Sequence, residues 1–353
     1  MNYVVINGKK STLVKGLLIQ ALPPISKPLM RTSIEEIDGR DGDIVTKLGY
    51  SAYDKQMSVG LFGDFDIDEV ISFFDSEGII IFSNEPDKFY RFQTLEQIDF
   101  EKLLRFRTAT VTFHVQPFKY SAVDDDILFT KDKMRFKYYT ATQNGVTITC
   151  ENGVISIKGT ATKQTEFYVP IWAMYLSAGE YTLTSLLSGT GANGCQMRVI
   201  GETPTDADSF GGEAIPLGGD LTATLSASKT FNYIWFNLPT GAKNLTLVVG
   251  VIDEDFETCQ VFNRGNIISR PFLTLYGTGD VTLSVNGEEL FEIALDEYIT
   301  IDAEKMNAYK GDTLANRSVV GDYSKLSFKI GTNTISWEGE LSQIEVGNVS
   351  RWI

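Results

Sequence analysis

Histidine is almost absent from this sequence, which has only His114 among its 353 residues. A Ser-His-Asp or Cys-His catalytic arrangement would have to use this one imidazole, and ordinary zinc sites need several His or Cys ligands. His114 lies in the strand-like stretch TVTFHVQPF, where a structural role is more common than catalysis. The sequence therefore predicts that the protein is not an enzyme, and it indicates no catalytic residue, metal site or cofactor.

Cysteine, positive charge and long apolar runs are also scarce. Three widely separated cysteines in apolar stretches predict buried thiols rather than disulfides: Cys150, Cys195 and Cys259. The formal net charge of −15 argues against a nucleic-acid partner and against attraction to an anionic membrane. No apolar run is long enough to span a bilayer, and the N-terminus lacks the pattern of a secretory signal. We therefore expect synthesis in a cytoplasm.

Glycine, in contrast, is plentiful, with 31 residues in a chain whose hydrophobic content is 43%. This composition favours a globular protein of many short strands joined by tight turns. Helical periodicity occurs only in DFDIDEVISFFDSEG, residues 64–78. Asp66 can cap this helix, Glu69 completes a capping box, and Gly78 can end it. The expected apolar face comprises Ile67, Val70, Ile71 and Phe74.

The middle of the chain, from about residue 124 to 259, contains only strand patterns, and turns separate them at near-regular spacing. This arrangement predicts a β-sandwich of the jelly-roll kind. Its first hairpin, VTITCENGVISIKG, turns at Asn152-Gly153. The rest of the chain is again all-β, and Asn286-Gly287 marks a hairpin there. The core-facing residues of the first hairpin are expected to be Val146, Ile148 and Cys150, opposite Ile155 and Ile157.

Several short motifs match functional patterns only in part. GTGANG, residues 189–194, has the spacing of a dinucleotide-binding loop, but a strand follows it instead of a helix. Glu338 and Glu340 could form the carboxylate pair of a glycosidase, although surface charge is the simpler interpretation. Solvated charge or a helix N-terminus explains three acidic stretches more simply than bound Ca²⁺ does: 64–68, 124–126 and 253–255.

The placement of aromatic residues gives the candidate binding site. In FNYIWFNLP, strand alternation puts Phe231, Tyr233 and Trp235 on one side and apolar residues on the other. One side can fill a core while the other offers rings to the C–H face of a sugar, or the strand can be covered on both sides. The predicted carbohydrate-binding residues are these three together with Tyr168, Trp172 and Tyr175, whose placement leaves the same two alternatives open.

Two groups of motifs resemble those of siphophage distal tail proteins. YVVINGKKS, GLLIQALPPISKP, EEIDGRDGDIV and VTFHVQPFKY are similar to the family's N-terminal belt. NRGNIISRPFLTLYGTGDVTLSVNG and KIGTNTISWEGE are similar to its galectin-like β-sandwich. The motifs occur in the family's order, and the resembling blocks cover about two thirds of the chain. Between Ala122 and Phe262 the chain departs from the short members, and this segment resembles jelly-roll modules related to carbohydrate-binding modules.

The resemblance implies a mainly β protein of three domains. These are a ring-forming belt domain with one short helix at 1–128, an inserted carbohydrate-binding-module-like jelly-roll β-sandwich at 129–262, and a galectin-like β-sandwich at 263–353. It also implies a virion structural protein of the phage tail tip, synthesised in the host bacterial cytoplasm. There a ring, usually a hexamer, links the tail tube to the baseplate.

The partners that the resemblance implies are further copies of the chain, the tail tube protein, the tape-measure protein, and tail-tip or receptor-binding proteins. We expect the inserted domain to bind host cell-surface saccharide and so to assist adsorption. Fold alone does not prove such binding. Two alternatives stay open: the inserted domain hydrolyses cell-wall polysaccharide, or it is only an architectural spacer.

Overall fold

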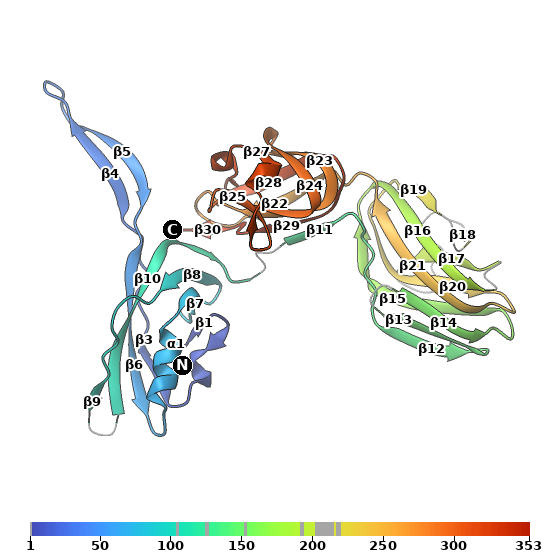
Figure 1. Ribbon diagram of the computed structural model, residues 1–353, viewed down its shortest axis with the longest axis horizontal. Helices are drawn as coiled ribbons and strands as arrows, with labels where there is room; N and C mark the ends of the chain where they lie inside the picture. The colour runs from blue at the N-terminus through green and yellow to red at the C-terminus, as the bar shows by residue number, and fades with distance from the viewer. Residues whose placement is uncertain are drawn as a thin grey trace.

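The computed structural model describes residues 2–103, 106–123, 127–151, 154–190, 194–201, 215–216 and 220–353. It confirms the mainly β fold class, since strands dominate and the described residues form a single α-helix. The chain folds into three units, which we call the N-terminal unit, the inserted sandwich and the C-terminal sandwich (Figure 1). Each unit surrounds a hydrophobic core of its own. Within the described ranges, no helix is long and apolar enough to cross a membrane.

The N-terminal unit is built on an antiparallel sheet in the order β2-β1-β7-β8-β10-β6-β3, and β9 and β30 also pair with β10. Val111, Phe113 and Val115 of β10 are fully buried, because alternate side chains of a strand face the same side of the sheet. The strands are β1 (Val4–Ile6), β2 (Lys9–Lys10), β3 (Leu17–Ala21), β6 (Tyr53–Phe62), β7 (Glu77–Phe82), β8 (Lys88–Gln93), β9 (Glu101–Leu103), β10 (Phe106–Ser121) and β30 (Arg351–Trp352), with a short 3₁₀ helix at Ser11–Leu13.

Helix α1 (Ile67–Phe74) begins as predicted, because the Asp66 side chain accepts a hydrogen bond from the Asp68 amide at 2.9 Å. Two details of the prediction are wrong. Ile71 is 40% exposed, and Phe73 is buried in its place. The adjacent rings of Phe73 and Phe74 bury more area than an isoleucine, which turns the helix toward them. The helix also ends at Phe74, so that Gly78 lies within β7 instead of ending the helix.

Strands β4 (Met30–Glu36) and β5 (Asp43–Tyr50) pair only with each other among the described strands. They form an antiparallel hairpin that extends away from the N-terminal unit (Figure 1). We call it the projecting hairpin. Almost all of its side chains are exposed, including the cross-strand pair Ile34 and Val45 at 60% and 55%. A hairpin of two strands is marginal by itself, so contacts with another chain would stabilise it.

The inserted sandwich packs a six-stranded sheet, β12-β13-β14-β21-β16-β19, against a four-stranded sheet, β15-β20-β17-β18. The predicted first hairpin is confirmed, with Ile148 opposite Ile157 and Cys150 opposite Ile155. Its strands are β12 (Tyr139–Gln143), β13 (Val146–Glu151), β14 (Val154–Thr160), β15 (Thr165–Leu176), β16 (Gly179–Thr190), β17 (Gln196–Ile200), β18 (Ile215–Pro216), β19 (Leu221–Leu225), β20 (Lys229–Leu238) and β21 (Lys243–Asp253). The predicted turn Asn152-Gly153, the acidic run 124–126 and positions 191–193 of the glycine-rich loop lie outside the described residues.

The C-terminal sandwich contains the strand path β11-β29-β23-β24-β25-β26, and β22, β27 and β28 pair with it or with each other. The predicted turn at Asn286-Gly287 is confirmed, since φ is 53° and 79° there, as a tight hairpin turn requires. The strands are β11 (Ile127–Thr130), β22 (Thr258–Asn263), β23 (Phe272–Val285), β24 (Glu288–Asp302), β25 (Asn307–Lys310), β26 (Thr313–Leu314), β27 (Val319–Gly321), β28 (Gly331–Glu338) and β29 (Leu341–Gly347), with short 3₁₀ helices at Asn316–Ser318 and Tyr323–Lys325.

Strand pairing places the ends of the inserted segment in a different unit from the one that the sequence suggests. β11 pairs with β29, and β22 pairs with β28, so both belong to the C-terminal sandwich. Sequence patterns did not show this, because a strand pattern does not identify its partner strand. The inserted sandwich is thus inserted in the chain between β11 and β22, two strands of the C-terminal sandwich. That double connection limits how the inserted sandwich can move.

Two asparagines of the resembling motifs are buried and structural. Asn263 donates hydrogen bonds to the carbonyls of Ile267 and Phe328 at 3.0 and 3.2 Å, and its own carbonyl accepts from the Gly265 amide at 2.8 Å. Asn333 is bonded in the same way by the loop before β28. Such short motifs therefore fix loops by satisfying buried backbone groups.

Candidate functional site

The six predicted carbohydrate-binding residues all lie on β15 and β20, which pair in the four-stranded sheet of the inserted sandwich. Their exposure differs widely. Trp172 and Tyr175 are 60% and 67% exposed, whereas Tyr168, Tyr233 and Trp235 are half-buried and Phe231 is fully buried. The six predicted residues therefore fall into three groups. Tyr168, Tyr233 and Trp235 lie on the outer face of the sheet, Trp172 and Tyr175 are more exposed, and Phe231 lies in the core.

The prediction that Phe231 shares the outer face with Tyr233 and Trp235 is wrong. Phe231 belongs to the core of the inserted sandwich. The pairing of β15 with β20 shifts between Pro170 and Met174, so strict alternation along β20 is broken there. A bulge of this kind turns the side chains beyond it toward the opposite face. The alternation in FNYIWFNLP could not show the bulge, because its extra residues are on the partner strand.

On the outer face, Tyr168, Trp235 and Arg198 lie opposite one another on three neighbouring strands. The Arg198 guanidinium is 5.2 Å from the Trp235 ring centroid, a cation–π contact that occupies part of this ring. The Tyr168 hydroxyl donates to Glu166 at 3.3 Å. Burial, followed by the Glu166 carboxylate, raises the pKa of Tyr168 above its usual value. The aromatic side chains of the outer face are therefore already in contact with polar side chains of the same sheet, Arg198 and Glu166.

Trp172 and Tyr175 line a groove of about 530 Å³, which we call the junction groove. One wall is the second half of β15, and the other is β11 of the C-terminal sandwich, followed by the segment that leads into the inserted sandwich. Its volume falls within the range of ligand sites, roughly 300–1,000 Å³. The lining residues are Leu128, Phe129, Thr130, Lys133, Arg135, Trp172, Ala173, Met174 and Tyr175.

The bulge in β15 explains why Trp172 is so exposed. Residues 171–173 lie within the shift between the pairs Pro170–Tyr233 and Met174–Phe231, and both Trp172 and Ala173 are exposed. The Trp172 amide donates to the Arg135 carbonyl at 2.9 Å, so the bulged strand is held by the segment across the groove. The ring thus projects from a fixed backbone.

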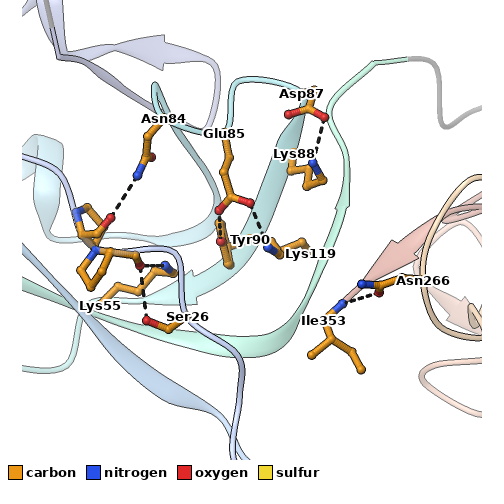
Figure 2. Close-up of polar contacts among 12 residues, drawn as sticks. Ser26, Lys55, Asn84, Glu85, Asp87, Lys88, Tyr90, Lys119, Asn266 and Ile353 are labelled. Atoms are coloured by element: carbon orange, nitrogen blue, oxygen red, sulfur yellow. Dashed lines mark hydrogen bonds and ion pairs between the residues drawn. The ribbon is translucent and has the colours of Figure 1, made fainter.

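A second notable site is a buried polar cluster where the projecting hairpin leaves the N-terminal unit (Figure 2). Lys55 donates to the Pro24 carbonyl at 2.8 Å, and Asn84 donates to the Pro23 carbonyl at 3.0 Å. Glu85 accepts from Lys119 at 2.8 Å. Lys55, Glu85 and Lys119 are all buried. The cluster therefore fixes the proline-containing segment that leads to the hairpin.

Charge in this cluster is not balanced, since two lysines surround one carboxylate. Burial lowers the pKa of Lys55 to about 8. Glu85 opposes this effect and Lys119 adds to it. The Lys55 ammonium also lies 4.8 Å from the Tyr90 ring centroid. The hydroxyl of the same tyrosine donates to Glu85, and burial raises its pKa well above its usual value.

The N-terminal unit and the C-terminal sandwich contact each other through named polar groups. Glu304 accepts from the Tyr120 hydroxyl at 2.6 Å and forms an ion pair with Arg91. Within the N-terminal sheet, the Arg351 guanidinium of β30 lies 4.0 Å from the Phe118 ring centroid of β10. The Ile353 amide donates to Asn266 at 2.9 Å (Figure 2). With β30 paired to β10, these contacts join the end of the chain to its first unit.

The other residues considered from the sequence have structural partners. His114 Nδ1 lies 2.7 Å from Asp54 on the neighbouring strand β6. Glu340 forms an ion pair with Lys131 at 3.3 Å. The predicted thiols are confirmed, since all three cysteines are free and buried. In the part of the chain that the structure describes, no group of three or more His, Cys, Asp or Glu side chains is placed to hold a metal ion.

A scan against protein-family models and a search of curated proteins found no match for the chain. Among solved structures, it is similar to the Dit protein of phage SPP1, described as a paradigm of the hub adsorption apparatus in phages that infect Gram-positive bacteria. Identity is 14%, the match covers 71% of this chain and 98% of the other, and the TM-score is 0.30. It is also similar to the baseplate of phage P2 in its activated conformation with Ca, with 10% identity, coverage of 98% and 97%, and a TM-score of 0.36. These two structures are a hub adsorption protein and a baseplate of phages.

Proposed function

We propose that the chain is a structural protein of a phage tail tip, in which copies of the N-terminal unit assemble into a ring. The order of the belt and galectin-like motifs in the sequence supports this assignment. The observation that carries it is the projecting hairpin. The outer edges of its strands pair with no other described strand, and Ile34 and Val45 expose adjacent apolar side chains. Such a surface favours association with another chain.

A double substitution tests this assembly. Ile34→Lys with Val45→Lys places two charges on the hairpin, where they touch no core residue. We expect the wild-type chain to form a ring, alone or with its tail tube protein, and the variant to stay monomeric in native mass spectrometry. Val320→Lys is the control, because Val320 is a comparably exposed apolar residue, 67%, in the C-terminal sandwich. A wild-type chain that is monomeric under both conditions contradicts the proposal.

The inserted sandwich then serves to bind host cell-surface saccharide through exposed aromatic rings. Trp172 and Tyr175 at the junction groove support this role, since ring faces open to solvent suit stacking on the C–H face of a sugar. The outer-face residues Tyr168, Tyr233 and Trp235 form a second surface of the same kind. The groove is the better site, because Trp172 and Tyr175 are 60% and 67% exposed, whereas the outer-face rings are half-buried.

Binding of the labelled full-length chain to a broad glycan array tests the saccharide role. We expect binding that Trp172→Ala removes and that Trp235→Ala reduces less. Retained binding after both substitutions would place the site elsewhere, and no binding to any glycan would favour the spacer alternative. Shortened products in the same glycan samples would instead reveal the hydrolase alternative.

A further inference from the structure

A basic segment enters the inserted sandwich along the junction groove. In TKDKMRFKYY, every second residue from Lys131 to Lys137 is a cation, within a chain whose net charge is −15. Lys131 pairs with Glu340 at 3.3 Å, and Lys133 pairs with Asp253 at 3.1 Å. Arg135 and Lys137 are exposed and form no ion pair with any described residue. Two positive charges are therefore left uncompensated at this position.

These two cations lie beside the exposed tryptophan. Arg135 lines the groove, and its carbonyl holds the Trp172 amide. The Lys137 ammonium is 5.0 Å from the Trp172 ring centroid. Phe136, between them, forms a bridge with Ile171, which fixes the segment against the edge of β15. An aromatic ring and two cations thus lie together on two segments that backbone contacts hold side by side.

The groove lining contains Lys133 and Arg135 but no carboxylate among the described residues. Asp253 compensates the charge of Lys133 at 3.1 Å, so Arg135 is the unpaired cation of the lining, and exposed charges more than about 8 Å away are largely screened at physiological ionic strength. An arginine fork matches the two oxygens of a carboxylate or phosphate, and an aromatic face suits a sugar ring. Local charge and shape together thus favour a saccharide ligand that carries an acidic group.

We propose that the junction groove binds an anionic saccharide segment, with Trp172 and Tyr175 stacking on its sugar rings and Arg135 and Lys137 pairing with its carboxylate or phosphate groups. This inference rests on the saccharide-binding role proposed above and names the class of saccharide.

The test uses the full-length chain and matched glycan pairs on an array that differ only in the acidic group. One set pairs free uronates with their methyl esters, and the other pairs phosphorylated glycans with the dephosphorylated forms. We expect at least one acidic member to bind tenfold or more tightly than its neutral partner. The set that responds identifies carboxylate or phosphate as the ligand group. Equal affinity within every pair overturns the inference, although it leaves the proposed saccharide role intact.

Substitutions then show whether the groove is responsible. Arg135→Gln with Lys137→Gln should abolish the preference for the acidic member while retaining weak binding through the aromatic rings. The matched control is Lys158→Gln with Lys243→Gln, which removes two exposed lysine charges from β14 and β21 of the same sandwich. An equal loss in the control, or equally tight binding of poly-glutamate, would show nonspecific attraction and overturn the inference. Absence of binding to every glycan overturns both this inference and the saccharide role.

Discussion

Replacement of Lys55 by methionine should change how the stability of the N-terminal unit depends on pH. Lys55 is buried beside the projecting hairpin, and its pKa is lowered from 10.5 to about 8, chiefly by burial. The folded protein therefore binds the Lys55 proton less tightly than the unfolded chain does. Protonation of this buried amine destabilises the fold by about 3 kcal/mol, since each pKa unit corresponds to about 1.4 kcal/mol.

The sign follows from the two protonation equilibria. Between about pH 8 and about pH 10.5 the unfolded chain binds more protons at Lys55, so its contribution to the free energy of unfolding rises with pH. With these two pKa values, the rise between about pH 7 and about pH 9.5 is about 2 kcal/mol. Lys55→Met lacks this titration. Its stability relative to wild type should therefore fall by that amount over the same interval.

Urea unfolding read by pulse proteolysis can measure this difference, because mass spectrometry identifies fragments of the N-terminal unit separately from the two sandwiches. Comparing variant with wild type at each pH cancels the titration of all other groups that the substitution leaves undisturbed. Lys47→Met, on the exposed hairpin, controls for loss of a lysine charge. The value at one pH also contains the lost hydrogen bond to Pro24, so the slope is the decisive quantity. A difference that is constant from about pH 7 to about pH 9.5 would refute the reasoning.

Three further predictions concern packing and the junctions. Phe231→Ala should lower the unfolding free energy of the inserted sandwich by about 3–5 kcal/mol, whereas Trp172→Ala should change it by less than about 0.5 kcal/mol, as urea titration can measure. Gly265→Ala should detach β30 from β10, because a Cβ there would lie 1.9 Å from the Arg351 carbonyl oxygen; unchanged amide hydrogen exchange in β30 would contradict this. Glu304→Gln should weaken the contact between the N-terminal unit and the C-terminal sandwich by about 1 kcal/mol, seen as faster proteolysis near Tyr120.

Local patterns predicted the elements whose determinants are close together in the sequence. The cap at Asp66, the turn at Asn286-Gly287 and the first hairpin of the inserted sandwich depend on residues within a few positions of each other. Strand exchange between units depends instead on partners far away in the chain. β11 joins β29, and β30 joins β10, through pairings that no short window of sequence contains.

The strand pair β15 and β20 of the candidate site also combines features that local sequence predicts with features that depend on a distant strand. Alternation along β20 correctly places Tyr233 and Trp235 on the outer face, but it also predicts Phe231 there. The bulge that contradicts this lies on β15, between Pro170 and Met174. A proline within the strand was a signal that regular pairing would be interrupted. The basic residues at the groove were also visible as an alternating run, Lys131 to Lys137, but their proximity to Trp172 required the fold.

The bulge connects the shape of β15 with the role proposed for the inserted sandwich. In a regular strand, residues 171–173 could not present two consecutive exposed side chains, because successive side chains point to opposite faces. The bulge turns Trp172 toward β11 and the basic segment, and the bond from its amide to Arg135 holds it there. The resulting groove includes residues of both sandwiches, and the inserted sandwich is connected at both ends to strands of the C-terminal one. A ligand in the groove would contact both units, and its binding energy would oppose their separation.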